Sequence, residues 1–142
     1  MTFYVCKMTS TFETLRANLL TTVTASGISG TKAEPDSDDA KELSKKLWEK
    51  ETFEAWGETY NTDVTSVYFT SVAFLPLLQA STKKHGNMQG SILVISSMSG
   101  IMRDAQGHFS YNAAKGATVH LTKLMSGEFT KLGIRVNSIA PG

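Results

Sequence analysis

The chain has 142 residues, of which 41% are hydrophobic and 19% are charged, a composition typical of one soluble globular unit and not of a disordered or fibrous protein. Fourteen basic and thirteen acidic residues leave a net charge of +1, so no strong electric field attracts nucleic acid or an anionic membrane. The single cysteine, Cys6, excludes an intramolecular disulfide.

The first residues and the hydropathy of the chain bear on its location. No basic segment followed by an apolar core opens the chain, and no window is expected to approach the roughly 18 apolar residues that a membrane span requires. A lone cysteine is also typical of a reducing compartment. We therefore expect a cytoplasmic protein with neither a membrane nor a nucleic-acid partner.

Strands and helices are predicted to alternate from the start. Residues 2–6 indicate a short strand and residues 9–20 a helix, and a β-branched strand then ends in the small residues of TASGISG. In residues 33–51 acids precede lysines, the order that suits a helix macrodipole. We therefore expect a solvated helix there, and we interpret residues 33–51 as a helical insertion.

The remaining residues predict two long helices and two strands. Residues 52–81 and 109–132 carry apolar side chains at intervals of three or four, the pattern of helices with one buried side. The apolar run of residues 91–95 indicates a central parallel strand, and residues 133–142 another strand. The buried sides are expected to hold Phe53, Trp56, Tyr60, Val64, Val67, Val72, Leu75 and Leu78 in the first helix and Ala114, Ala117, Leu121, Leu124, Met125 and Phe129 in the second. The alternation predicts an α/β fold with a parallel sheet, in a single domain over residues 1–142.

Tyr111 and Lys115 lie four residues apart in the second long helix, so they share one of its sides. A free phenol has a pKa near 10, and a cation held beside a phenol favours its deprotonated form. A serine at the end of the preceding strand would hydrogen-bond a substrate carbonyl while the phenol exchanges a proton with the carbonyl oxygen. Since no side chain supplies a hydride, this chemistry requires a nicotinamide cofactor. The spacing alone leaves an ordinary surface pair as the alternative.

Three segments in order resemble the short-chain dehydrogenase/reductase family. SILVISSMSG, YNAAK and LTKLMSGEFTKLGIRVNSIAPG look like the family's serine strand, its Tyr-x-x-x-Lys helix and its IRVN-x-I-x-PG strand. The resemblance runs from about Gly27 to the last residue. It implies that Tyr111 is the acid/base, and that Lys115 favours the tyrosinate and holds the nicotinamide ribose. It also implies that Ser97, rather than Ser96, orients the substrate.

The same resemblance implies that Gly27, Pro141 and Gly142 contact the cofactor, together with the tyrosine and the lysine. The sequence departs from the family's pattern, however. The Gly-rich turn TG-x-x-x-G-x-G does not occur, CKMTS stands in place of a segment with an adenine-contacting Asp, and TASG stands in place of NNAG. Alignment on Trp56 puts Asp63 where the family has an active-site asparagine that holds a proton-relay water. A helix-surface or capping role is the alternative for Asp63.

These departures predict an incomplete Rossmann-like, doubly wound parallel sheet that lacks the family's first two strands and its last one. The chain is expected to hold the family's third to sixth strands, with a gap between residues 2–6 and the next strand. We expect a fragment of a longer enzyme, truncated at both ends.

The resemblance implies an NAD(P)-dependent oxidoreductase that interconverts a carbonyl and an alcohol by hydride transfer, with NADP slightly favoured over NAD. The substrate would be a small molecule, and the two long helices would pair in a homo-oligomer. The alternative is a catalytically inactive remnant that serves as an oligomerisation or interaction module. No metal site is predicted, because His85, His108 and His120 share no ligand spacing.

Overall fold

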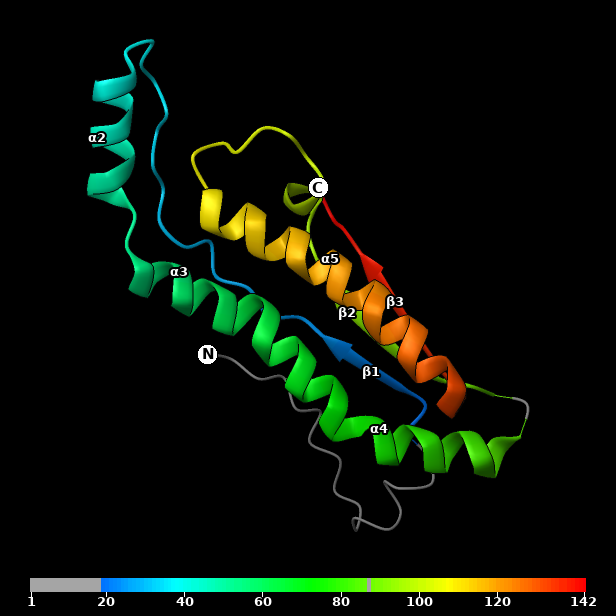
Figure 1. The fold of residues 1–142 in the computed structure, drawn as a ribbon. Helices are drawn as coiled ribbons and strands as arrows, with labels where there is room; N and C mark the ends of the chain where they lie inside the picture. The colour runs from blue at the N-terminus through cyan, green and yellow to red at the C-terminus, as the bar shows by residue number, and fades with distance from the viewer. Residues whose placement is uncertain (1–18, 87) are drawn as a thin grey trace.

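The computed structural model describes residues 19–86 and 88–142. The strand predicted over residues 2–6, the gap beside it and nearly all of the helix predicted over residues 9–20 lie outside the described residues. Within the described part, three parallel strands form one sheet in the order β1–β2–β3 (Figure 1). The predicted α/β fold with a parallel, Rossmann-like sheet is confirmed, and only part of that fold is present.

The three strands are short and in register. They are β1 (Thr21–Thr24), β2 (Gly90–Ile95) and β3 (Ile134–Ile139). In β2, Ile92 and Val94 are completely buried, as expected for the strand that pairs on both edges. The carboxyl ends of all three strands therefore meet at one edge of the sheet, the edge at which ligands bind in open parallel sheets.

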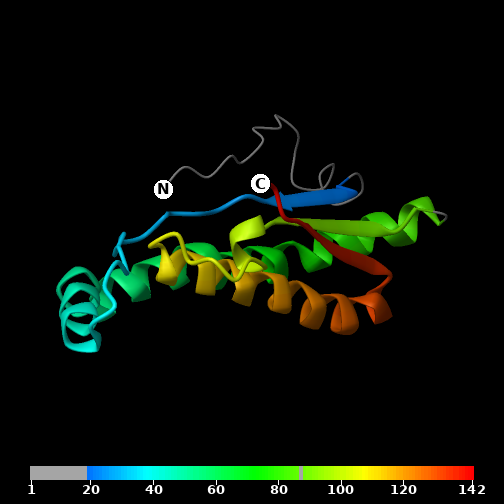
Figure 2. The same ribbon diagram turned by 90° about the horizontal axis from the view of Figure 1, so that it is seen from above.

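Helices α3 (Phe53–Tyr60), α4 (Ser66–His85) and α5 (Phe109–Phe129) lie on one side of the sheet, as Figure 2 shows. The predicted solvated helix is present as α2 (Ala40–Lys50), which lies apart from the sheet at one end of the molecule (Figure 1). The Asp39 side chain caps α2 by accepting the Glu42 N–H at 2.9 Å. No residue of α2 is buried.

The hydrophobic core fills the space between the sheet and α4 and α5. Its buried side chains are Val67 and Leu78 of α4, Ile92 and Val94 of β2, Met125 of α5, and Ile134 and Val136 of β3. Every second residue of β2 and β3 faces this core, because side chains alternate along a strand. The core therefore fixes α5 against the two strands whose ends bear the candidate site.

The long helix predicted over residues 52–81 is interrupted by a π-helical turn, η1 (Asn61–Thr65). One extra residue in a turn shifts the following side chains by about 100° around the helix, relative to a continuous α-helix. The predicted buried stripe is confirmed at Val67 and Leu78. It is wrong at Val72, which is 36% exposed, and at Phe53, which is 88% exposed and precedes the π-turn. Leu124 of α5 is likewise exposed. Polar residues occupy much of the buried side instead, namely Thr59, Asp63 and Ser71.

The segment Phe53–His85 is long and apolar enough to cross a membrane, with a mean hydropathy of 1.3. By this measure of length and composition, the prediction that no window approaches a membrane span is wrong. The test is weak evidence, because core helices of soluble proteins also satisfy it. In the described residues α4 packs against all three strands.

Candidate active site

Tyr111 and Lys115 lie one turn apart on α5. Lys115 is buried, at 3% exposed, and its Nζ lies 5.5 Å from the centroid of the half-buried Tyr111 ring. A buried ammonium is unfavourable unless other groups compensate its charge. The groups around Lys115 must therefore compensate its positive charge for the ammonium to lie beside this phenol.

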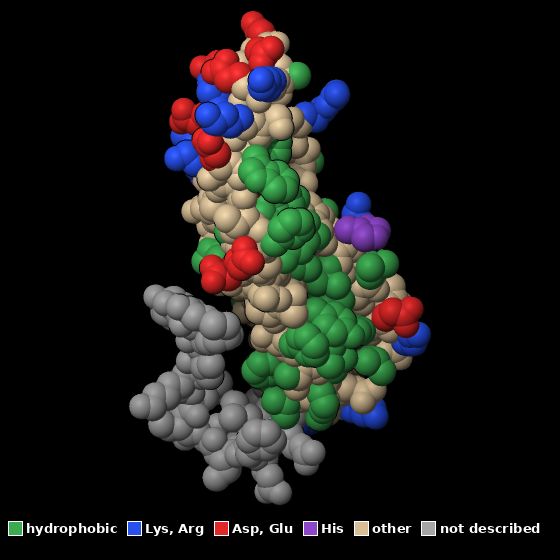
Figure 3. All heavy atoms as spheres, turned by 60° about the vertical axis from the view of Figure 1, so that its left-hand side comes forward, with side chains coloured by type: hydrophobic (Ala, Val, Ile, Leu, Met, Phe, Trp, Pro, Cys, Tyr) green, Lys and Arg blue, Asp and Glu red, His purple; other side chains and the backbone are tan. Residues whose placement is uncertain are grey.

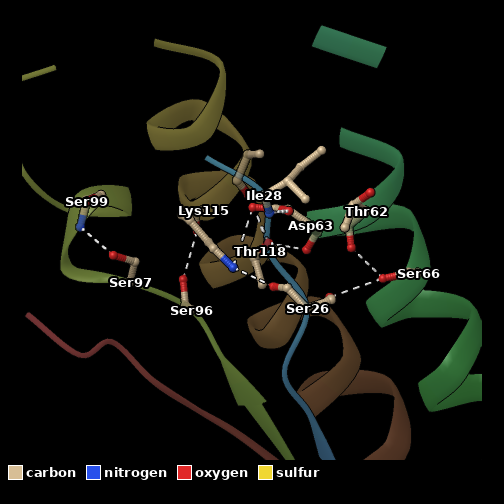
Figure 4. Close-up of polar contacts among 11 residues, drawn as sticks. Ser26, Ile28, Thr62, Asp63, Ser66, Ser96, Ser97, Ser99, Lys115 and Thr118 are labelled. Atoms are coloured by element: carbon tan, nitrogen blue, oxygen red, sulfur yellow. Dashed lines mark hydrogen bonds and ion pairs between the residues drawn. The ribbon is translucent and has the colours of Figure 1, made fainter. Parts of the chain in front are cut away.

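Two groups compensate the Lys115 ammonium (Figure 4). Its Nζ donates a hydrogen bond to the Ser26 carbonyl at 2.7 Å and lies 3.5 Å from Asp63 Oδ2. Asp63 Oδ1 in turn accepts the Ile28 N–H at 2.9 Å. The segment that follows β1 is thus tied to α5 by the lysine and to η1 by the aspartate.

Asp63 is completely buried, so the alternative that it is a helix-surface residue is wrong. Asp63 lies in the π-turn η1. The Thr118 hydroxyl is 2.9 Å from each of two acceptors, the carbonyl oxygens of Asp63 and Ala114, and donates to one or the other. Burial raises the pKa of the Asp63 carboxyl above its ordinary value, while the Ile28 N–H and the Lys115 charge act in the opposite direction.

The serines that follow β2 have different partners. The Ser96 hydroxyl is buried and donates to the Lys115 carbonyl at 3.0 Å, a structural role. The Ser97 hydroxyl is partly exposed and accepts the Ser99 N–H at 3.1 Å, which caps the short 3₁₀ turn η2 (Met98–Gly100). Among the described contacts none joins the Ser97 and Tyr111 hydroxyls. Ser97 remains the predicted substrate-orienting serine.

The end of β3 lies beside this turn. The Ser96 N–H donates to the Ile139 carbonyl and the Met98 N–H donates to the Pro141 carbonyl, both at 2.8 Å. Pro141 and Gly142 are exposed. The fold therefore brings the predicted residues together in two adjoining groups: the first contains Gly27, Asp63, Tyr111 and Lys115, and the second contains Ser97, Pro141 and Gly142. The Ser96 hydrogen bond to the Lys115 backbone connects them.

Sequence reasoning missed several residues of the site. Ser26 and Ile28 take part only through their backbone, and Thr118 acts on a carbonyl 55 positions away, so no local pattern marks them. Gly100 packs directly on α5, where an added Cβ would lie 2.4 Å from the Lys115 carbonyl carbon. The glycine that ends SILVISSMSG was the available signal for this close approach.

Comparison with known proteins agrees with this geometry. The model of the short chain dehydrogenase family matches residues 37–142, most of the chain. The chain belongs to the short-chain dehydrogenase/reductase family. The match covers η1, the serine turn, α5, β3 and the two residues Pro141 and Gly142, and so all of the candidate residues except Gly27.

Two fungal relatives in this family are similar in sequence. The short-chain dehydrogenase/reductase PhomF' of Diaporthe leptostromiformis is 38% identical over 139 residues, which cover 93% of this chain and 45% of the relative. The short-chain dehydrogenase/reductase SAT3 of Stachybotrys chartarum is 36% identical over 115 residues, which cover 71% of this chain and 42% of the relative. The chain thus spans less than half the length of these relatives.

Three solved structures share the fold. An oxidoreductase of the family from Burkholderia thailandensis superposes with a TM-score of 0.65 at 22% identity, over 87% of this chain and 40% of that chain. A 4-hydroxyisoleucine dehydrogenase complexed with NADH and succinate superposes with a TM-score of 0.60 at 27% identity, over 87% of this chain and 48% of that chain. ElxO, solved with NADP bound, gives a TM-score of 0.63 at 24% identity, over 86% of this chain and 41% of that chain.

Proposed function

We propose that this chain carries the catalytic half of an NAD(P)-dependent oxidoreductase that interconverts a carbonyl and an alcohol. The observation that carries the proposal is the buried Lys115 ammonium 5.5 Å from the centre of the Tyr111 ring, beside the carboxyl edge of a parallel sheet. Membership of the family supports it. So do neighbours whose structures contain NADP or NADH.

In this proposal Tyr111 is the acid/base. In carbonyl reduction its hydroxyl gives a proton to the carbonyl oxygen as the carbon gains a hydride, and in alcohol oxidation the same phenol oxygen takes that proton back. The Lys115 ammonium stabilises the negative charge that builds on the phenol oxygen, and the Ser97 hydroxyl hydrogen-bonds the carbonyl oxygen. A nicotinamide dinucleotide, when bound, supplies or accepts the hydride.

The surroundings of Gly27 fit the ribose end of such a cofactor. A Cβ at this position would lie 3.1 Å from Lys115 Nζ and 3.7 Å from Asp63 Oδ2, so glycine keeps the space beside the ammonium open. Asp63 Oδ2 has no hydrogen-bond donor among the described residues. We propose that Gly27, Lys115 and Tyr111 hold the nicotinamide ribose, and that Pro141 and Gly142 lie against the nicotinamide. NADP is slightly favoured over NAD by analogy alone.

Cofactor binding tests this proposal directly. We expect nicotinamide fluorescence to change and saturate when the purified chain is titrated with NADPH or NADH. Gly27→Ala should weaken binding, because the methyl group occupies the space beside Lys115 Nζ. Gly57→Ala is the matched control, since a Cβ at Gly57 meets nothing within 4 Å. Absence of binding at millimolar concentrations of either cofactor contradicts the proposal.

One observation favours the second candidate function, an oligomerisation or interaction module. Figure 3 shows hydrophobic side chains gathered in a band along the side of the molecule formed by α3 and α4. On α4, Tyr68, Phe69 and Val72 are 43%, 64% and 36% exposed, and Leu124 of the neighbouring helix α5 is 56% exposed. We propose that α4 and α5 pair with the same helices of a second copy.

The oligomer is tested by Phe69→Glu. A charge in the centre of an apolar interface must be desolvated, so we expect the variant to elute as a smaller species than the wild type in size-exclusion chromatography with light scattering. Trp48→Glu on α2 is the control, because Trp48 is even more exposed, at 79% against 64% for Phe69, but lies outside this surface. A wild-type chain that is already monomeric at micromolar concentration contradicts the pairing.

We further propose that residues 1–142 form one partial Rossmann-like domain in which α2 belongs to an insertion. The absence of buried residues in α2 supports this, because removal of the helix would leave the core unchanged. We also propose that the chain acts in the cytoplasm on a small-molecule substrate.

A further inference from the structure

The Asp63 carboxylate connects two parts of the site through its two oxygens (Figure 4). Oδ1 accepts the Ile28 N–H at 2.9 Å, and Oδ2 lies 3.5 Å from the Lys115 ammonium, which donates to the Ser26 carbonyl at 2.7 Å. These contacts close a ring. We propose that Asp63 is a positioning residue whose negative charge holds the Lys115 ammonium against the Ser26–Ile28 backbone, in the place required beside Tyr111. This inference rests on the proposed function.

The contact between Asp63 and Lys115 depends on charge. Oδ2 has no hydrogen-bond donor among the described residues, so a 3.5 Å ion pair, and not a short hydrogen bond, joins it to Nζ. The side chains are 0% and 4% exposed, and in such surroundings an uncompensated cation is strongly unfavourable. An asparagine at position 63 keeps an acceptor for the Ile28 N–H but sets a neutral amide donor beside the ammonium. In this proposal, such an asparagine holds the Ile28 N–H but loses the negative charge that holds the Lys115 ammonium in this chain.

The rest of the ring leaves the ammonium little freedom. The Thr118 hydroxyl contacts the Asp63 carbonyl and so links η1 to α5 one turn beyond Lys115. The Ser96 hydroxyl contacts the Lys115 carbonyl from the end of β2. Gly27 lies between the Ser26 carbonyl and the Ile28 N–H, the two backbone groups of the ring. Because glycine has no side chain, the space next to Lys115 Nζ stays open. Asp63 therefore sets the direction in which the lysine can present its remaining proton.

The ionisation of Asp63 controls this hold. In the described contacts the titratable group that faces Asp63 is Lys115, and those that face Lys115 are Asp63 from η1 and Tyr111 from α5. The segment after β1 and the end of β2 contribute the neutral Ser26 carbonyl and Ser96 hydroxyl. Burial raises the pKa of Asp63 above 3.8, so the ion pair is lost as the pH falls through that raised value.

The raised pKa of Asp63 also determines how its ionisation affects the stability of the fold. Because the folded-state pKa lies above the unfolded value, the contribution of Asp63 to stability is complete below pH 3.8 and is lost as the pH rises through the folded-state pKa. At neutral pH the charge of Asp63 therefore works against folding. A buried charge retained at that cost is consistent with a role in orienting Lys115.

The test compares Asp63→Asn and Asp63→Ala with the wild-type chain by NMR. Asp63→Asn is expected to leave hydrogen exchange of the Ile28 amide within about threefold of wild type and to speed exchange of the Lys115 ammonium protons about tenfold or more. Asp63→Ala should speed both. Glu128→Gln removes the same charge from an exposed surface pair and should change neither. Unchanged Lys115 exchange in folded Asp63→Asn overturns the proposal.

NADPH affinity provides a separate reading. Asp63→Asn should weaken NADPH binding about tenfold, as expected for one lost charge-assisted contact. If the wild-type chain binds no NADPH, the proposed function fails, and the exchange rates alone decide the role of Asp63. If Asp63→Asn does not fold, the wild-type chain is titrated from about pH 7 to about pH 3. The Ile28 amide and Lys115 side-chain resonances should then shift with one midpoint, and separate midpoints overturn the proposal.

Discussion

Replacement of Tyr111 by phenylalanine is expected to lower the rate of carbonyl reduction by about 100- to 10,000-fold, the usual contribution of a positioned acid/base. The change removes only the hydroxyl that exchanges the proton. The ring that lies 5.5 Å from Lys115 Nζ remains, so NADPH affinity should stay within a few-fold of the wild-type value. The measurement is NADPH oxidation with a panel of small ketones and aldehydes, next to a fluorescence titration of NADPH.

Tyr68→Phe is the matched control for this experiment. Tyr68 lies on α4 and is 43% exposed, so removal of its hydroxyl should leave both the rate and the affinity unchanged. If Tyr111→Phe retains the wild-type rate, Tyr111 is not the acid/base. If neither wild type nor variant turns over any substrate while both bind NADPH, the inactive-module alternative is favoured.

Substitution of Gly100 by alanine is expected to destabilise the chain by about 1–3 kcal/mol, the usual effect of overpacking. The added Cβ would lie 2.4 Å from the Lys115 carbonyl carbon and 2.6 Å from the Gly116 backbone nitrogen. Neither contact can be relieved by rotation of a side chain, so η2 must move away from α5. The free energy of unfolding in urea measures the effect.

Gly127→Ala is the control for Gly100→Ala. Gly127 lies in α5, the helix on which Gly100 packs, but an added Cβ at Gly127 meets nothing within 4 Å. Alanine is the better helix former, so this substitution should stabilise the chain by up to about 1 kcal/mol. Equal effects of the two substitutions would contradict the close packing of η2 on α5. Because Ser97 caps η2, a shift of this turn should also disturb the proposed site.

The sequence predicted well those features that depend on neighbouring residues. The apolar run of β2 and the spacing of α5 are local patterns, and both elements form where they were expected. The four-residue separation of Tyr111 and Lys115 suffices to place them on one side of α5, because the helix has 3.6 residues per turn. The order of the three motifs indicated the family, which the family model confirms. The catalytic and cofactor-binding roles of these residues stay predictions.

The tertiary structure decided what long-range packing controls. The π-turn at Asn61–Thr65 carries the buried Asp63, and no local signal in the sequence distinguished this turn from a continuous helix. From the sequence, a position in the site and a position on the helix surface were equally favoured for Asp63. The fold buries Asp63 beside Lys115, where the carboxylate compensates the charge of the buried ammonium. Lys115 in turn contacts a backbone carbonyl 89 positions away, and only the folded chain brings those groups together.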